Sequence, residues 1–278
     1  MNNPLQQYFK VPKLYVKLPS QYQFYDPADV DMSANQEVAV YALSARDQIL
    51  LKTPDALLNG ETLIQIMSNC VPGIRHVQQL VEPDINTLLL AIKIATQGNK
   101  AEWNVSCPNC QKEQTFEINL TEIIEQQSFM EEDPSVSLND NLIVKVKPFN
   151  FEQRNLTLIN EIEESQAVKL MQEDQTLNTE QQAKQIAQIV SNMTDRLFQL
   201  VAKSVLSVTI VQTGQVVTDP QHIQEFVMNL TKYQADAITE KVKDLNRTGI
   251  SPNQKFVCSS CNHAWDHDLD FDPLSFFE

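Results

Sequence analysis

Two short cysteine pairs are the residues in this sequence best suited to chemistry. Cys107 and Cys110 form one C-x-x-C motif, and Cys258 and Cys261 form another. Two cysteines three positions apart on a tight turn can direct both sulfurs at one ion, and two such turns complete a tetrahedral tetrathiolate site. The sequence therefore predicts these four cysteines as ligands of one structural metal ion per chain. Zinc is the default for such a site, and iron is the alternative.

The separation between the two pairs differs from that of a common zinc ribbon. About 15 to 20 residues usually lie between the pairs, whereas here residues 111–257 intervene. Strand-like residues precede each pair, Trp103 to Val105 and Phe256-Val257. We expect a ribbon whose two hairpins are separated by an inserted helical domain. The alternatives are two unrelated turns or a redox pair, although neither pair opens a helix after a strand.

The histidines offer little support for catalysis. His263 follows Cys261 closely and is an alternative ligand, but such a histidine more often supports the turn by hydrogen bonding. Four thiolates leave no coordination position open for a catalytic water, so the zinc is expected to be structural. Neither H-E-x-x-H nor G-x-S-x-G occurs, and the other histidines are scattered along the chain. We therefore predict that the protein is not an enzyme.

Aspartates alternate with larger side chains near the C-terminus. Trp265, His267, Leu269 and Phe271 alternate with Asp266, Asp268, Asp270 and Asp272. A strand here would bury the first set and expose the aspartates. A calcium loop is the alternative, but it lacks the glycine and the glutamate that an EF-hand loop requires.

Charge and hydropathy narrow the classes of partner. The net charge of -15 at pH 7 repels nucleic-acid phosphates and anionic lipid, and Lys10, Lys13 and Lys17 form only a thin basic arm. The N-terminus has no secretory signal, and the longest apolar stretch, 88–95, is too short to span a bilayer. The sequence has only five glycines, and they lie far apart, so they cannot form the glycine-rich loop that binds phosphate groups. We expect a soluble protein made in the cytoplasm, with reduced cysteines and with neither nucleic acid nor membrane as a partner.

The N-terminal half must position the first cysteine pair. Residues 1–31 are rich in proline and aromatic residues and are predicted as an extended arm, which either docks on another subunit or wraps over its own core. A capping-box pattern predicts a helix from Ser33, with Gln36 three residues on. Further helices are predicted over 60–70, with Cys70 on the apolar face, and over 84–97.

The segments beyond the first pair alternate between strands and helices. We predict a hairpin around 103–120, an acidic loop or linker over 122–140, and a strand over 142–146. From 151 to 249 the chain is predicted to be mainly helical, with a possible hairpin over 205–217. A long helix opens at Thr179, and helices follow from Asp219-Pro220 and over 233–246. The apolar stripe of the long helix is interpreted as core: Ile186, Ile189, Met193, Leu197 and Leu200.

These elements predict an α+β fold, mostly helical, with a split zinc ribbon interrupted by a helical insertion. Four parts are expected along the chain. An extended arm covers 1–31, and an N-terminal helical domain covers 32–101. The split zinc ribbon covers 102–120 and 254–278, and the inserted, mainly helical domain covers 121–253.

Several short motifs resemble one known family. They are Lys17-Leu18-Pro19-Ser20, the run from Asp84 to Ile92 that leads through Gly98 into Trp103 to Cys110, and the stretches 258–263 and 271–277. In these motifs the chain resembles the baseplate hub-assembly proteins of T-even-type contractile-tailed bacteriophages. The resemblance implies a structural or assembly role in the phage tail tip, no enzymatic activity, and the four cysteines as metal ligands. The polar segment around Gln166 to Gln188 has no counterpart in that family pattern.

Three functions follow as hypotheses. The first is a baseplate or hub component that binds other tail proteins through its arm and helical insertion, with a possible oligomer in the assembly. The second is a transient chaperone of hub or tape-measure assembly that is absent from the mature virion. The third is a zinc-ribbon nucleic-acid adaptor, against which the acidic charge argues. The first two place the protein in the host cytoplasm during assembly, and in the virion tail baseplate if it is retained.

Overall fold

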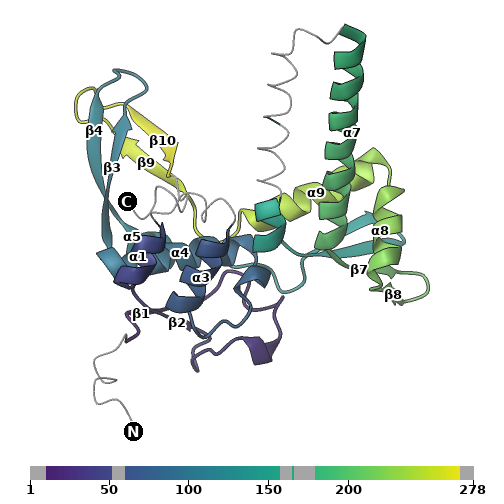
Figure 1. Ribbon diagram of the computed structural model, residues 1–278, viewed down its shortest axis with the longest axis horizontal. Helices are drawn as coiled ribbons and strands as arrows, with labels where there is room; N and C mark the ends of the chain where they lie inside the picture. Colours follow the sequence, from purple (N-terminus) through teal and green to yellow (C-terminus); the bar gives the residue numbers. More distant parts are fainter. Residues whose placement is uncertain (1–10, 52–59, 157–164, 166–178, 270–278) are drawn as a thin grey trace. The chain divides into compact units, whose positions relative to one another are not determined.

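The chain divides into two compact units. The computed structural model describes residues 11–51, 60–156, 165 and 179–269. Unit 1 consists of Met1–Met130 together with Arg247–Glu278, and unit 2 is the segment Glu131–Asn246 between them. Figure 1 shows the helices and strands of both units. Helices and strands are mixed along the chain, so the fold class is α+β, as predicted.

The N-terminal segment of unit 1 packs on that unit's own core. Strand β1 (Leu14–Val16) pairs antiparallel with β2 (Val38–Val40), and a 3-10 helix, η2 (Pro27–Asp29), lies between them in the chain. Leu18 is fully buried. Of the two alternatives for the predicted arm, residues 11–31 therefore follow the one in which it wraps over its own core. Lys10 lies outside the described residues.

The helix predicted from Ser33 is absent, and this prediction was wrong. The Ser33 side chain accepts hydrogen bonds from the N–H groups of Asn35 and Glu37, and Gln36 has a left-handed backbone with φ 59°. Serine forms such local turns as readily as helix caps, so the pattern was ambiguous. The first helix, α1 (Ala45–Leu51), instead follows Ser44, which exchanges capping hydrogen bonds with Asp47.

Two further helices build the core of unit 1. Helix α3 (Glu61–Cys70) buries the apolar face that was predicted for it, Cys70 included. A 3-10 helix, η3 (Val77–Gln79), leads to α4 (Glu82–Gln97), which buries nearly every side from Ile85 to Ile92 and ends at Gly98 with φ 99°. Because both faces of α4 are apolar, this helix lies in the middle of the core.

Two antiparallel hairpins carry the cysteine pairs. The first is β3 (Lys100–Ser106) with β4 (Glu113–Asn119), and the second is β9 (Asn253–Val257) with β10 (Ala264–Asp268). In the second hairpin Leu269 is buried and Trp265 half-buried, but His267 is exposed, so the predicted burial of His267 was wrong. A two-stranded hairpin leaves much of each strand open to solvent. Phe271, Asp270 and Asp272 lie outside the described residues.

The acidic stretch 122–140 is the predicted loop only in part: residues 126–134 form neither helix nor strand, but the two ends of the stretch do. Helix α5 (Leu120–Glu125) buries Leu120 and Ile123, and strand β5 (Ser135–Asn139) joins the sheet of unit 2. The segment has the composition of a loop, but tertiary contacts decide its structure.

Unit 2 is a four-stranded antiparallel sheet packed with helices. The strand order is β5-β6-β7-β8, with β6 (Leu142–Val146), β7 (Val205–Ile210) and β8 (Gln215–Val217). The helices are α7 (Thr179–Ser204), α8 (Pro220–Met228) and α9 (Lys232–Asn246). Valines of the strands pack on apolar residues of the helices in one core, which includes Val144, Val146, Val208, Val227, Ile238 and Val242.

The core interpretation of the α7 stripe was wrong for three of its members. Ile186, Met193 and Leu197 are 42%, 45% and 51% exposed. Burial is reached only at the end of the helix, where Val201 and Ala202 join the core of unit 2. In Figure 1 the N-terminal part of α7 extends away from the sheet, so periodicity alone gave no measure of how far the core reaches.

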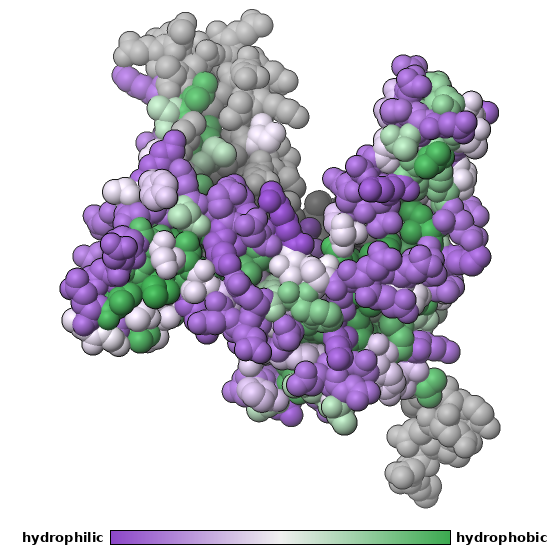
Figure 2. Space-filling view, turned by 180° about the vertical axis from the view of Figure 1, so that it is seen from behind, coloured by the Kyte–Doolittle hydropathy of each residue, from purple (hydrophilic) through white to green (hydrophobic). Residues whose placement is uncertain are grey.

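The visible surface is largely polar. Figure 2 shows hydrophilic residues over most of one face, with apolar areas interspersed among them. Among the helices that the structure describes, none combines the length and the apolar character needed to cross a bilayer.

A buried carboxylate fixes the N-terminal segment on α4. Asp84 is fully buried in the first turn of α4 and accepts three hydrogen bonds, from the Ser20 N–H (2.8 Å), the Ser20 hydroxyl (2.5 Å) and the Tyr25 hydroxyl (2.6 Å). Desolvation by burial raises the pKa of Asp84 to about 6, although the hydrogen bonds from Ser20 and Tyr25 lower it.

We predict that Asp84 makes the stability of unit 1 depend on pH. Its folded-state pKa of about 6 exceeds the unfolded value, so the folded state binds this proton more tightly. The free energy of unfolding should therefore fall by up to about 3 kcal/mol as the pH rises from about 4 to about 7. Asp84→Asn should remove that component of the slope in denaturant titrations. Equal slopes for both proteins would contradict the assignment.

Candidate metal centre

The two cysteine turns have the same backbone structure. In the first, the Gln111 N–H donates to the Cys107 carbonyl (2.8 Å), and in the second, the Asn262 N–H donates to the Cys258 carbonyl (2.9 Å). Gln111 and Asn262 both have left-handed backbones, with φ 59° and φ 54°. The first cysteine of each turn also donates its N–H across the turn, to Lys112 and His263 respectively. Two backbone hydrogen bonds thereby close each turn in the same way.

The four sulfurs, predicted from sequence as one site, lie together in unit 1. Cys107 Sγ lies 3.7 Å from Cys261 Sγ, and Cys110 Sγ lies 3.6 Å from Cys258 Sγ. All four sulfurs lie within 4.8 Å of one another. A tetrahedron with metal–sulfur bonds of about 2.3 Å has sulfur–sulfur distances of about 3.8 Å. The observed distances therefore fit a four-coordinate ion, and they are too long for disulfides.

An aromatic cluster holds the two hairpins against each other. The Phe116 ring of β4 lies 4.5 Å from the Phe256 ring of β9, centroid to centroid, and 6.0 Å from that of Trp265. Phe256 is only 4% exposed and shares a core with Leu90 of α4 and Leu120 of α5. Apolar packing thus positions the hairpins next to the helices of unit 1, independently of any ion.

Two amide side chains of the first hairpin reach sulfurs of the second. Gln114 Nε2 donates to Cys258 Sγ at 2.8 Å, and Asn109 Nδ2 donates to Cys261 Sγ at 3.6 Å. Desolvation raises the pKa of Cys258. Hydrogen bonds from the Ser260 and Cys261 N–H groups and from Gln114 together outweigh this effect and lower the pKa to about 6. Neither amide was predicted from the sequence. Asn109 lies inside the motif, whereas nothing in the sequence marks Gln114.

The four sulfurs differ in their access to solvent. Cys107 and Cys258, the first cysteine of each turn, are buried, whereas Cys110 and Cys261 are exposed. His263 is not one of the clustered groups. Its ring stacks on Trp265 at 6.3 Å, so the alternative of His263 as a ligand has no support in this arrangement.

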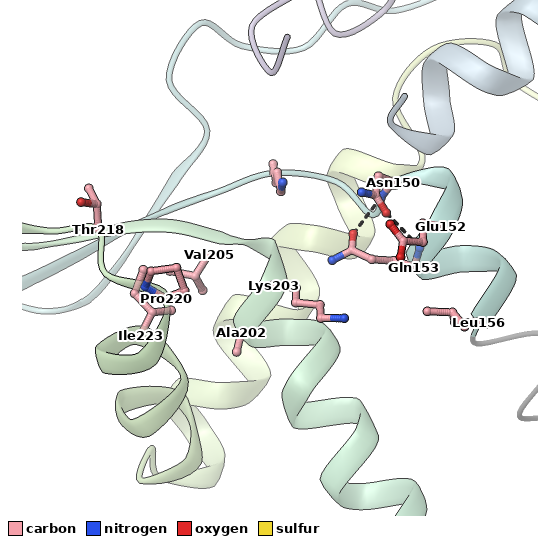
Figure 3. A pocket seen from close by; sticks show the side chains of 11 residues that line it. Asn150, Glu152, Gln153, Leu156, Ala202, Lys203, Val205, Thr218, Pro220 and Ile223 are labelled. Atoms are coloured by element: carbon pink, nitrogen blue, oxygen red, sulfur yellow. Dashed lines mark hydrogen bonds between the residues drawn. The ribbon is translucent and has the colours of Figure 1, made fainter. Parts of the chain in front are cut away.

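Other polar groupings in the described part of the chain do not form a comparable site. Unit 2 has a cavity of about 330 Å³. Figure 3 shows the side chains that line it, among them Lys203 and Asn150. There Asn150 and Gln153 exchange hydrogen bonds of 2.9 Å as an ordinary helix cap. His76 lies near Asp29 in unit 1, and His222 lies near Asp219 at the start of α8 in unit 2. The two pairs therefore do not form one site. The cysteine cluster is therefore the strongest candidate for chemistry.

One comparison with known proteins gives a match. A family model described as T4 bacteriophage base plate protein matches residues 35–278, which include all four clustered cysteines. No curated protein and no solved structure matches the chain. The resemblance recognised in the sequence is confirmed by the family match.

We predict that Phe256 is required for the hairpins to pack together. Phe256→Ala should lower the free energy of unfolding of unit 1 by about 3 to 5 kcal/mol, because a large buried ring is removed. Val257, its neighbour on the opposite face, is 56% exposed and offers a matched control. Val257→Ala should change stability by less than about 0.5 kcal/mol. Similar losses for both variants in thermal or denaturant unfolding would contradict the packing argument.

Proposed function

We propose that this chain, which belongs to the T4 bacteriophage base plate protein family, is a non-enzymatic structural component of a contractile phage tail baseplate or hub. The main observation in support of a structural metal site is the cluster of four cysteine sulfurs, which all lie within 4.8 Å of one another. Its donor set is a complete tetrathiolate, which leaves no position for a substrate or a reactive water.

The ion we propose is zinc, bound by Cys107, Cys110, Cys258 and Cys261. Thiolates favour soft or borderline ions, and a tetrahedral set of four is typical of structural zinc, with iron as the alternative. When bound, the ion would join the first hairpin to the second and so stabilise unit 1. The matching hydrogen bonds of the two turns support a split zinc ribbon.

We also propose that the segment between the hairpins is an insertion into this ribbon. The compact unit Glu131–Asn246 supports this, since both flanking segments belong to unit 1. The proposed division is an arm over 1–31, a helical domain over 32–101, the ribbon over 102–120 and 254–278, and an insertion over 121–253. Of that insertion, 131–246 form unit 2, whereas 121–130 and 247–253 belong to unit 1.

The proposed partners are other proteins of the phage tail. The exposed apolar residues of α7 in the insertion support a protein-binding surface there. The net charge of -15 disfavours the third hypothesis, a nucleic-acid adaptor, because phosphates would be repelled. Assembly would take place in the host cytoplasm and the protein would remain in the tail baseplate.

We predict one zinc ion per purified chain. Elemental analysis by mass spectrometry should find it in the wild type, and Cys107→Ser and Cys258→Ser should each lose it together with thermal stability. One substitution in each turn tests whether the two turns share the ion. Cys70→Ala is the control, because Cys70 is buried in α3 outside the cluster. It should retain the zinc.

The same measurement can refute the proposal. Wild-type protein purified without chelators that contains no metal would refute the zinc site. A variant at one turn that leaves the full metal content in place would refute a shared ion and the split ribbon with it.

We predict that the protein is present in purified mature tails. Quantitative mass spectrometry of virions should find it at a fixed ratio to other baseplate proteins. Its presence in assembly intermediates and absence from finished virions would instead support the second hypothesis, a transient chaperone.

A further inference from the structure

Gln114 connects the two hairpins through one side chain. It lies on β4, four residues after Cys110, and its cross-strand neighbour is Val105. Its Nε2 donates to Cys258 Sγ at 2.8 Å, while its Oε1 accepts from the Ser259 N–H at 2.9 Å and from the Ser259 hydroxyl at 2.8 Å. One amide therefore makes three hydrogen bonds to the opposite turn.

The donor end of this amide meets the atom that carries charge. Four thiolates around a divalent ion have a net charge of about −2, which N–H groups directed at sulfur stabilise. Two N–H donors are directed at Cys258 Sγ. One is Gln114 Nε2, and the other is the Ser260 N–H, which lies 3.4 Å from the sulfur. Because Cys258 is buried, water cannot replace these donors without moving the turn.

We infer that Gln114 is a positioning residue for the metal: it orients Cys258 across the hairpin interface and directs an N–H at the sulfur that would bind the ion. This inference rests on the proposed zinc site. The acceptor end of the amide has a separate role, because its bonds to Ser259 hold the turn whether or not an ion is bound.

The two ends of the amide can be separated by substitution. In Gln114→Glu the carboxylate can still accept from Ser259, but it cannot donate to sulfur and it adds negative charge beside the thiolates. Gln114→Ala removes both roles. Glu113→Ala is the matched control, because Glu113 is exposed and adjacent side chains of a strand point to opposite faces.

The test is zinc transfer from purified full-length protein to a competing chelator, with cobalt substitution as a second readout. Loss of an outer-shell partner weakens metal affinity by about 10- to 100-fold. We expect losses in that range for Gln114→Glu and Gln114→Ala, wild-type affinity for Glu113→Ala, and a shifted thiolate-to-cobalt charge-transfer band in both Gln114 variants. That band reports on the ligand sulfurs, and a purely structural role would leave it unchanged.

The outcomes separate this inference from the proposed function. Wild-type zinc affinity and an unshifted cobalt band in Gln114→Glu would overturn the role of the N–H donor, while the zinc site itself would stand. Wild-type protein that binds neither zinc nor cobalt would overturn the site and this inference together. Loss of affinity in Gln114→Ala alone would assign Gln114 to the turn and overturn its action on the sulfur.

Discussion

The structure of unit 1 depends on holding together two hairpins that are far apart in the sequence. Closing a flexible loop as long as residues 111–257 costs about 4 kcal/mol of chain entropy. The intervening segment is itself folded, however, and its ends meet within unit 2. Glu131, at the start of unit 2, forms an ion pair with Lys241 of α9, near its end. A folded segment with adjacent ends therefore spares the two hairpins most of that entropic cost.

The chain leaves and re-enters unit 1 at one place. The Ser128 N–H donates to the Gly249 carbonyl at 2.9 Å, and the Gly249 N–H donates to the Ser128 hydroxyl at 3.0 Å. Gly249 has φ 99°, and a β-carbon there would lie 2.9 Å from Pro19 of the N-terminal segment. Only glycine fits both the left-handed backbone and this close approach. The N-terminal segment, held by Asp84, thus forms part of the place where the chain leaves unit 1 and returns to it.

Local patterns in the sequence were enough for the cysteine cluster, because the spacing of each C-x-x-C motif fixes how its sulfurs point. They were also enough for α3 and α4, whose apolar positions repeat over several turns. They failed where one short pattern fits two structures, as at Ser33, and where exposure depends on how far a core extends, as at Met193. The contacts of Gln114 with Cys258 and of Ser20 with Asp84 are not visible in the sequence, since no metal-ligand motif marks a distant partner for Gln114 or Ser20 as it does for the cysteines.

The two units differ in how much of their apolar surface is buried, and this difference fits the proposed role in a baseplate. Unit 1 combines a cluster of four cysteine sulfurs, an aromatic hairpin interface and a buried hydrogen-bonded carboxylate. Unit 2 exposes apolar residues along α7, where burial would repay about 25 cal/mol for each Å² removed from water. A unit with many internal contacts, in one chain with a unit that has unburied apolar surface, suits a protein that must keep its shape while it binds neighbours. The acidic charge then favours neighbours that present basic surfaces, because complementary charge speeds and orients association.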